Sequence, residues 1–223
     1  MGYDFEFSFL LQYGDVLLRG IWLTIKLTAI SVVVGLAVGV AGAAAKTSSY
    51  RVARWIAGAY VELIRNTPFL VQLFLLFFGL SSLGVKLSAE QAALLAMVIN
   101  LGAYSTEIVR AGIHAVQRGQ IEAAESLALS RLQIFRHVIL VPALEKIYPA
   151  LTSQFVIIML GSAVVSQISA EELTWASNFI QSRTFRSFEA YFVVGAIYLA
   201  LSLSLRQVFR VLGTRLFAHR QRA

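Results

Sequence analysis

The chain has 223 residues, of which 58% are hydrophobic and only 14% are charged, and its mean hydropathy is +0.72. A soluble domain contains roughly 45–50% apolar and about 25% charged residues, so a soluble fold of this composition would lack polar surface. The net charge of +7 does not indicate nucleic-acid binding, because the basic residues lie between and after apolar segments, where orientation in a bilayer explains them. The sequence therefore predicts an integral membrane protein.

Residue usage excludes several kinds of chemistry. The chain has no cysteine, so disulfides, thiolate catalysis and Cys-ligated metals are excluded. The three histidines, His114, His137 and His219, are not spaced as a helical ligand pair, and we expect neither a metal site nor a bound cofactor. The first residues carry Asp4 and Glu6 where a signal peptide would be basic, so we expect the spans themselves to direct insertion.

Five apolar stretches approach the roughly 20 residues that a helix needs to cross a bilayer. We expect transmembrane helices at about 21–45, 56–80, 89–113, 147–168 and 191–212, with a short amphipathic segment before the first. The prediction is an all-α integral membrane protein with about five transmembrane helices, in which residues 1–223 form a single domain.

The distribution of lysine and arginine predicts the orientation. The first connection, the third connection and the tail carry lysine and arginine. Opposite them lie the acidic N-terminus, the short second connection and a segment with Glu171, Glu172, Arg183 and Arg186. The cytoplasmic candidates are Lys46, Arg51, Arg54, Arg118, Arg131, Arg136, Lys146, Arg206, Arg210, Arg215, Arg220 and Arg222. We therefore expect the N-terminus outside and the C-terminus in the cytoplasm.

The longest extramembrane segment is the loop at about 114–146. It shows a small-residue helical pattern over 120–127 and a second, amphipathic pattern that begins at Ser130, a good N-cap. Pro142 is expected to end the second pattern before the fourth span. Such a pair of helices can fit a groove in a cytoplasmic partner, or it can simply join two spans.

This loop resembles the EAA loop of ABC importer permeases. Glu122, Ala123 and Ala124 match the Glu-Ala-Ala opening of that loop, and its later apolar positions are matched as well. Ala128 stands where the family has glycine, and Pro142 falls one residue late. A left-handed turn at that position would cost alanine roughly 1–2 kcal/mol.

Three further segments resemble the polar amino acid uptake branch of these permeases. They read YVELIRNTPFLVQLFLLFFGL from Tyr60, GAYSTEIVRAGI from Gly102 and SQISAEELT from Ser166. Many relatives carry Lys-Asp-Thr-Ser-Leu late in the fourth span, whereas this chain has Leu-Gly-Ser-Ala-Val at 160–164, so the substrate cannot be copied from the family.

The resemblance implies a type I ABC importer in a bacterial inner membrane. Such an importer contains a cytoplasmic ABC ATPase dimer, a second permease chain that is identical or paralogous, and a periplasmic or external solute-binding protein. This chain has no G-x-x-x-x-G-K-[ST] phosphate loop, so ATP and Mg²⁺ are expected in the ATPase and no enzyme activity is expected here.

The resemblance also places the ATPase-coupling surface in the first part of the loop. The implied coupling residues are Glu122, Ala123, Ala124, Ser126, Leu127 and Ala128. Small side chains would allow close backbone approach to the ATPase. The rival interpretation of Glu122 is charge complementarity at a helix N-terminus.

Polar residues inside spans are costly and usually face a partner or a cavity. Glu62 and Arg65 share a helix face and are expected to pair, with Pro68 kinking the helix. The candidates for a substrate pathway are Asn100, Glu107, Gln154, Ser162 and Gln167. Glu107 can alternatively pair with Arg110, and the hydroxyl of Ser162 can stabilise helix packing without contacting substrate.

Gly35 and Gly39 in the first span form a GxxxG pattern, which indicates close helix packing. Taken together, the residues predict the permease subunit of an ATP-driven importer of polar amino acids or opine-like compounds that works by alternating access. Two rivals are a secondary transporter, which would need both halves of a pathway, and a membrane scaffold that docks a cytoplasmic partner.

Overall fold

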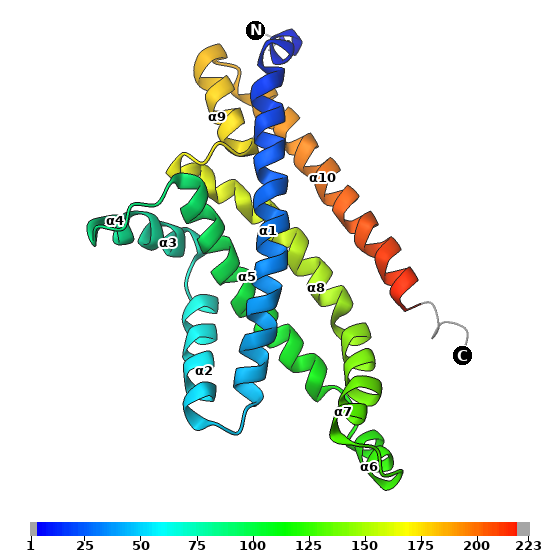
Figure 1. Ribbon diagram of the computed structural model, residues 1–223. Coiled ribbons are helices and arrows are strands. Elements are labelled where there is room, and N and C mark those ends of the chain that lie inside the picture. Colours follow the sequence, from blue (N-terminus) through cyan, green and yellow to red (C-terminus); the bar gives the residue numbers. More distant parts are fainter. Residues whose placement is uncertain (1–3, 218–223) are drawn as a thin grey trace.

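The computed structural model describes residues 4–217, and within this range every regular element is a helix. The long helices are α1 (Gly14–Thr47), α5 (Ala89–His114), α8 (Val141–Gly161) and α10 (Ser187–Leu216). Shorter ones are η1 (Ser8–Tyr13), α2 (Arg51–Arg65), α3 (Phe69–Phe74), η2 (Leu75–Gly79), α4 (Leu80–Ser82), α6 (Arg118–Ser126), α7 (Arg131–Gln133), η3 (Ile134–Leu140), η4 (Ser162–Ile168) and α9 (Leu173–Thr184). Figure 1 shows α1 running the length of the molecule beside α5 and α8.

Close packing of α1 against α5 forms the centre of the molecule. A Cβ atom added at Gly39 would lie 2.4 Å from the Ser105 side chain, and one added at Gly35 would lie 3.0 Å from Leu101. Only glycine allows this approach of the two backbones, so the predicted packing role of the GxxxG pattern is confirmed. The first helix begins at Gly14 and therefore includes residues that we assigned to an interfacial segment.

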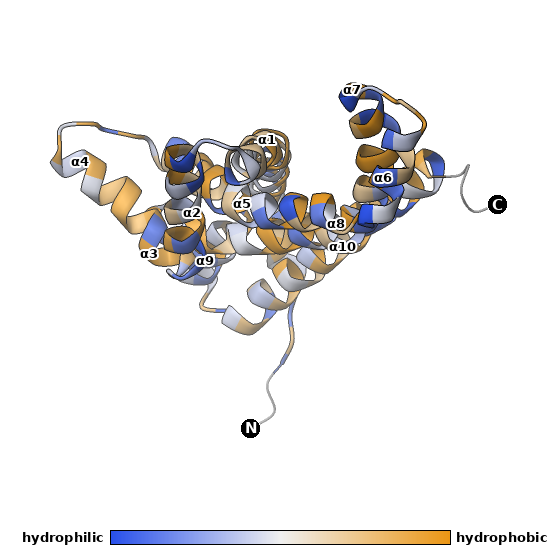
Figure 2. Ribbon diagram, turned by 90° about the horizontal axis from the view of Figure 1, so that it is seen from below, coloured by the Kyte–Doolittle hydropathy of each residue, from blue (hydrophilic) through white to orange (hydrophobic). Residues whose placement is uncertain are grey.

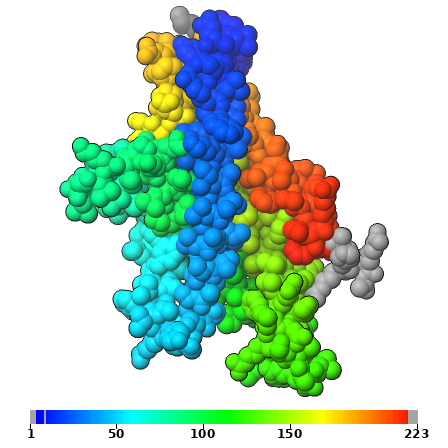
Figure 3. All heavy atoms as spheres, in the orientation of Figure 1, coloured from blue at the N-terminus to red at the C-terminus, as the bar shows by residue number. Residues whose placement is uncertain are grey.

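Among the described residues, four helical segments are long and apolar enough to cross a membrane, and a bent pair of helices would make five. The bent pair is Arg51–Arg65 with Phe69–Ser82, whose axes turn by 110° at the break. The second predicted span at 56–80 is therefore not one kinked helix. Figure 3 shows the resulting arm of α3 and α4 projecting sideways from the body.

The expectation that Pro142 ends a helix before the fourth span is wrong. Residues Arg131–Ile168 form one continuous helical segment, in which α7 passes through the π-helical turn η3 into α8. Proline lacks the N–H that an α-helix needs and its ring clashes with the carbonyl four residues earlier. The π-helical turn η3 ends at Leu140, two residues before Pro142, so Pro142 lies in the first turn of α8, where its missing N–H is tolerated.

A further helix, α9, follows η4 and precedes α10 in the chain, and it lies at the end of the molecule where α1 begins (Figure 1). A Cβ added at Gly20 of α1 would lie 3.0 Å from Leu173 Cα, so α9 rests directly on the α1 backbone. Thr24 Oγ1 accepts a 3.3 Å hydrogen bond from the Leu173 N–H. The opposite end of the molecule carries α6 and α7.

Candidate functional site

The segment that resembles the EAA loop projects from one end of the molecule. Helix α6 covers the first predicted pattern, and Figure 3 shows α6 and α7 protruding beyond the long helices. Ala124 is buried, whereas Glu122 and Ala123 are exposed. Figure 2 shows mixed polar and apolar residues over this projection. The segment presents a small-residue surface that a separate protein can contact.

Glu122 is held loosely by its own helix. Its carboxylate lies 3.5 Å from the guanidinium of Arg118, and both side chains are largely exposed. The Ser126 hydroxyl donates to the Glu122 carbonyl at 2.9 Å. An exposed ion pair of this kind contributes little stability, so Glu122 remains accessible to a partner.

Ala128 adopts the left-handed backbone that glycine would adopt, with a φ of 58°. The Ala128 N–H donates to the Glu125 carbonyl at 2.9 Å, and the Leu129 N–H donates to the Ala124 carbonyl at 3.2 Å. These two bonds form a Schellman motif that closes α6. Leu127 beside it is 76% exposed. The turn therefore forms although alanine replaces glycine.

The second half of the segment begins as predicted at Ser130. The Ser130 hydroxyl accepts from the Gln133 N–H, while Gln133 Oε1 accepts from the Ser130 N–H at 2.9 Å. This capping box fixes the start of α7. The predicted N-cap is confirmed.

Asn100 lies in the middle of α5 and is directed at the broken second segment. Its Nδ2 donates to Gln72 Oε1 at 3.0 Å, and both side chains are buried. Gln72 Nε2 donates in turn to the carbonyl of Ile64 at 2.7 Å and to that of Thr67 at 3.0 Å. Gln72 therefore satisfies carbonyls that the break leaves free. Sequence reasoning missed this residue because its partners lie on both sides of the break.

Glu62 and Arg65 do not pair within the described chain, contrary to expectation. Asn66 Nδ2 donates to Glu62 Oε2 at 3.0 Å, and the Arg65 guanidinium lies 5.3 Å from the centre of the Tyr104 ring. Arg65 lies at the last residue of α2, where Pro68 and the break follow. Both residues lie in α2, but the Glu62 carboxylate accepts from Asn66 and the Arg65 guanidinium lies over Tyr104 instead.

Glu107 forms ion pairs with two cations. Its carboxylate lies 2.6 Å from Lys46 Nζ of α1 and 2.7 Å from the Arg110 guanidinium. The alternative pairing with Arg110 is thereby confirmed. An opening of about 480 Å³ adjoins this cluster, and its charged lining residues are Arg65, Glu107, Arg110 and Lys146. Three cations and one anion make it suited to a carboxylate, and Arg65 and Lys146 are additions to the predicted set.

The five predicted pathway residues do not converge on one site. Gln154 is half-buried in α8, Gln167 is exposed in η4, and the buried Ser162 hydroxyl donates to the Met159 carbonyl at 2.6 Å. Because η4 is a 3₁₀ helix, Ser162 and Ser166 do not lie one above the other as residues four apart do in an α-helix. Their roles in transport stay predictions.

Glu172 is fully buried at the opposite end of the molecule. It caps α9 by accepting from the Trp175 N–H at 2.9 Å, and it accepts from the Tyr198 hydroxyl of α10. Burial raises the pKa of the Glu172 carboxyl, and these hydrogen bonds only partly oppose the rise. Among residues 4–217, no cluster of His, Asp or Glu is arranged to hold a metal ion.

Comparisons with known proteins agree with this architecture. The chain is 31% identical to the arginine transport system permease protein ArtQ of Bacillus subtilis, over 91% of this chain and 93% of that protein. It is 35% identical to the nopaline transport system permease protein NocM of Agrobacterium fabrum, over 88% of this chain and 86% of that protein. A crystal structure of an amino acid ABC transporter with histidines matches with a TM-score of 0.89 and 38% identity, covering 96% of this chain and 100% of that chain.

The family model of binding-protein-dependent transport system inner membrane components matches residues 19–218, which include all of the long helices except the start of α1. That range contains the broken second segment, the projecting α6 and the closing helix α10. The chain belongs to the family of binding-protein-dependent transport system inner membrane components.

Proposed function

We propose that the chain is the permease subunit of an ATP-driven importer of amino acids or opine-like compounds. The observation that carries this proposal is the likeness to an amino acid ABC transporter at 38% identity over 96% of the chain. Relatives named for arginine and for nopaline transport support the same class of substrate. Both names describe compounds that combine a carboxylate with a basic side chain.

The proposed division of labour assigns ATP hydrolysis to a separate ATPase dimer that binds ATP and Mg²⁺. The exposed small-residue surface of α6 supports docking there, because it projects beyond the other helices (Figure 3). The other partners would be a second permease chain, identical or paralogous, and an external solute-binding protein. The expected orientation places α6 in the cytoplasm and α9 outside.

The opening beside Glu107 is the candidate contact for the carboxylate of the substrate. Arg65 and Lys146 line it and form no ion pair within residues 4–217, whereas Glu107 balances Arg110. A guanidinium group binds a carboxylate through two parallel hydrogen bonds. In alternating access this opening would face the cytoplasm after the substrate has passed the membrane centre.

Reconstitution tests the proposal. The chain, its ATPase, its second permease chain and its binding protein are assembled in proteoliposomes, and uptake of a panel of radiolabelled amino acids and opines is measured with and without ATP. ATP-dependent uptake of one or a few of these compounds is expected. Uptake driven by an ion gradient without ATP would indicate a secondary transporter, and ATPase binding without uptake of any compound would indicate a scaffold.

A further inference from the structure

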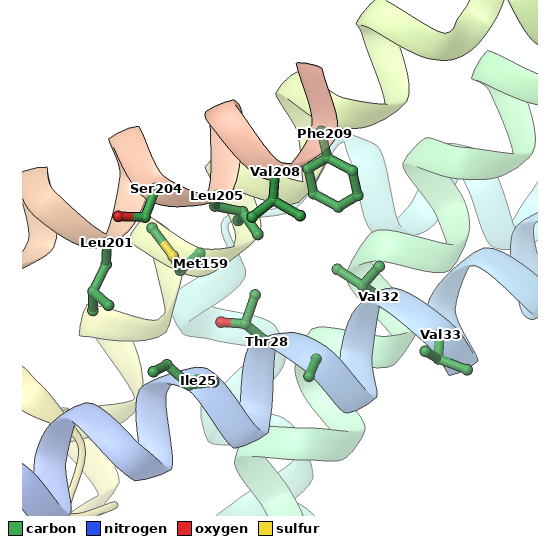
Figure 4. A pocket seen from close by; sticks show the side chains of 11 residues that line it. Ile25, Thr28, Val32, Val33, Met159, Leu201, Ser204, Leu205, Val208 and Phe209 are labelled. Carbon is green, nitrogen blue, oxygen red and sulfur yellow. The ribbon is translucent and has the colours of Figure 1, made fainter. Parts of the chain in front are cut away.

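Two cavities meet at Phe209 of α10. The first has a volume of about 430 Å³ and lies between α1, α8 and α10, lined mainly by apolar side chains such as Ile25, Val32, Met159 and Leu205. Figure 4 shows the side chains of α1 and α10 facing each other across it, with Met159 between them. The Thr28 hydroxyl in its wall already donates to the Thr24 carbonyl at 2.7 Å. Its chemistry suits a hydrocarbon chain.

The second cavity has polar and charged side chains in its lining and lies further toward the C-terminal end of α10. It has a volume of about 420 Å³, and its lining includes Arg206, Arg210, Thr152 and Ser153 together with Phe209. Phe209 thus lines both cavities, and the two adjoin at this side chain.

The contact between α8 and α10 fixes the walls of both cavities. The Phe209 ring lies 5.3 Å from the Phe155 ring, and the Tyr148 hydroxyl donates to the Phe209 carbonyl at 2.6 Å. A Cβ at Gly213 would lie 2.7 Å from the Tyr148 ring, so glycine is needed there for the ring to pack on α10. Specific contacts therefore fix the position of α10 on α8 beside both cavities.

Arg206 and Arg210 lie one turn apart on α10, and both are exposed. Neither makes an ion pair within residues 4–217. Like charges at this spacing repel each other, and arginine beside an apolar span is costly without a counter-charge. An anion placed between the two guanidinium groups would remove both costs.

We propose that the two cavities together bind one anionic phospholipid, with an acyl chain in the cavity between α1, α8 and α10 and the phosphate at Arg206 and Arg210. Arginine binds phosphate oxygens through paired hydrogen bonds. Basic pockets between transmembrane helices on the cytoplasmic side bind anionic lipid headgroups. The proposal depends on the membrane location of the family and on the expected orientation, not on the identity of the transported solute.

Native mass spectrometry of the assembled transporter in nanodiscs tests this proposal. The nanodiscs contain phosphatidylcholine and phosphatidylglycerol, and retained lipid is counted after mild release. Wild type is expected to retain phosphatidylglycerol in preference to phosphatidylcholine. Replacing both arginines, Arg206→Gln with Arg210→Gln, is expected to reduce that preference by roughly thirtyfold.

Two matched controls separate a specific site from general basic charge. Arg215→Gln removes a charge from the same helix outside both cavities and is expected to leave the preference unchanged. Ser204→Phe fills the apolar cavity and is expected to lower retention of either lipid, whereas Leu203→Phe, on a residue that lines neither cavity, is not. The paired arginine variant decides the question even if Ser204→Phe fails to fold.

Several outcomes would overturn the proposal. Equal retention of the two lipids by wild type, or an equal loss in Arg215→Gln, would leave only a diffuse basic anchor. Displacement of phosphatidylglycerol by excess inorganic phosphate would indicate a site for free phosphate. Because the chain has no cysteine, Ser204→Cys can be crosslinked cleanly, and crosslinking to a second permease chain would show that protein covers the groove.

Discussion

The Asn100 side-chain amide donates a hydrogen bond of 3.0 Å to Gln72 Oε1 and so joins the middle of α5 to α3. Gln72 uses its own N–H groups on the carbonyls of Ile64 and Thr67, at the end of α2 and in the break. The two amides together hold the broken segment at its 110° bend. Asn100 therefore acts on the position of this segment, in addition to any contact with substrate.

Replacing Gln72 tests this role. Gln72→Leu removes the side-chain donor to the part-buried Ile64 and Thr67 carbonyls and leaves the buried Asn100 amide without its acceptor. Leaving a buried polar group unpaired costs about 1–3 kcal/mol. We expect a lower midpoint of thermal denaturation, with Asn100→Leu acting in the same direction and the double variant being less destabilised than the sum of the two. Gln207→Leu, at an exposed position, is the control. Loss of transport by Asn100→Leu with an unchanged midpoint would instead favour direct substrate contact.

Ala128 offers a test of the turn after α6. Ala128→Gly removes the strain of a left-handed alanine, which costs roughly 1–2 kcal/mol, although glycine gains entropy when unfolded. We expect slower hydrogen exchange in α6. Ala128→Val should accelerate exchange, because a β-branched residue tolerates a φ of 58° poorly. Faster exchange in the glycine variant would contradict the assigned turn.

The first, third and fifth predicted spans correspond to long helices, because each is a continuous apolar run without a break. The second differs because the average hydropathy over 56–80 does not reveal the break. The contacts that stabilise the break come from Gln72 and Asn100 and join residues distant in sequence. Pro142 was assigned the wrong effect because the π-helical turn before it has no simple sequence signal.

The sequence predicted contacts within one helical turn of the candidate site but not contacts between distant helices. Local patterns identified the start of α7 at Ser130 and the pairing of Glu107 with Arg110, both of which involve residues within one turn. Lys46 joins that pair from α1, and Arg65 and Lys146 come to the same opening from α2 and α8. Such convergence depends on helix packing, which no local pattern encodes.

Labelling with a membrane-impermeant maleimide tests the expected orientation. Leu83→Cys and Leu127→Cys are matched, because the native side chains are 79% and 76% exposed and the chain has no other cysteine. In intact spheroplasts we expect labelling at position 83, and labelling at position 127 only after the membrane is opened. The reverse pattern would invert the topology.

Glu172 should make stability depend on pH. Its pKa is raised in the folded state, so the folded chain keeps a proton that the unfolded chain, with a carboxyl pKa of about 4.3, has released. Stability from this group is present at low pH and falls as pH rises through the folded pKa. Glu172→Gln keeps an acceptor for the Trp175 N–H but does not titrate, so we expect its thermal midpoint to change less with pH. An identical pH profile would contradict the buried, raised-pKa carboxyl.

Substrate-stimulated ATP hydrolysis by the reconstituted transporter tests the central claim, which is that α6 couples this chain to an ATPase. Glu122→Arg and Asp15→Arg each reverse one charge of an exposed i,i+4 ion pair, at opposite ends of the molecule. We predict that Glu122→Arg lowers stimulated hydrolysis by about tenfold or more, as expected for an interface anchor, while Asp15→Arg leaves it unchanged. Full stimulation in the Glu122→Arg transporter would contradict the coupling role of α6.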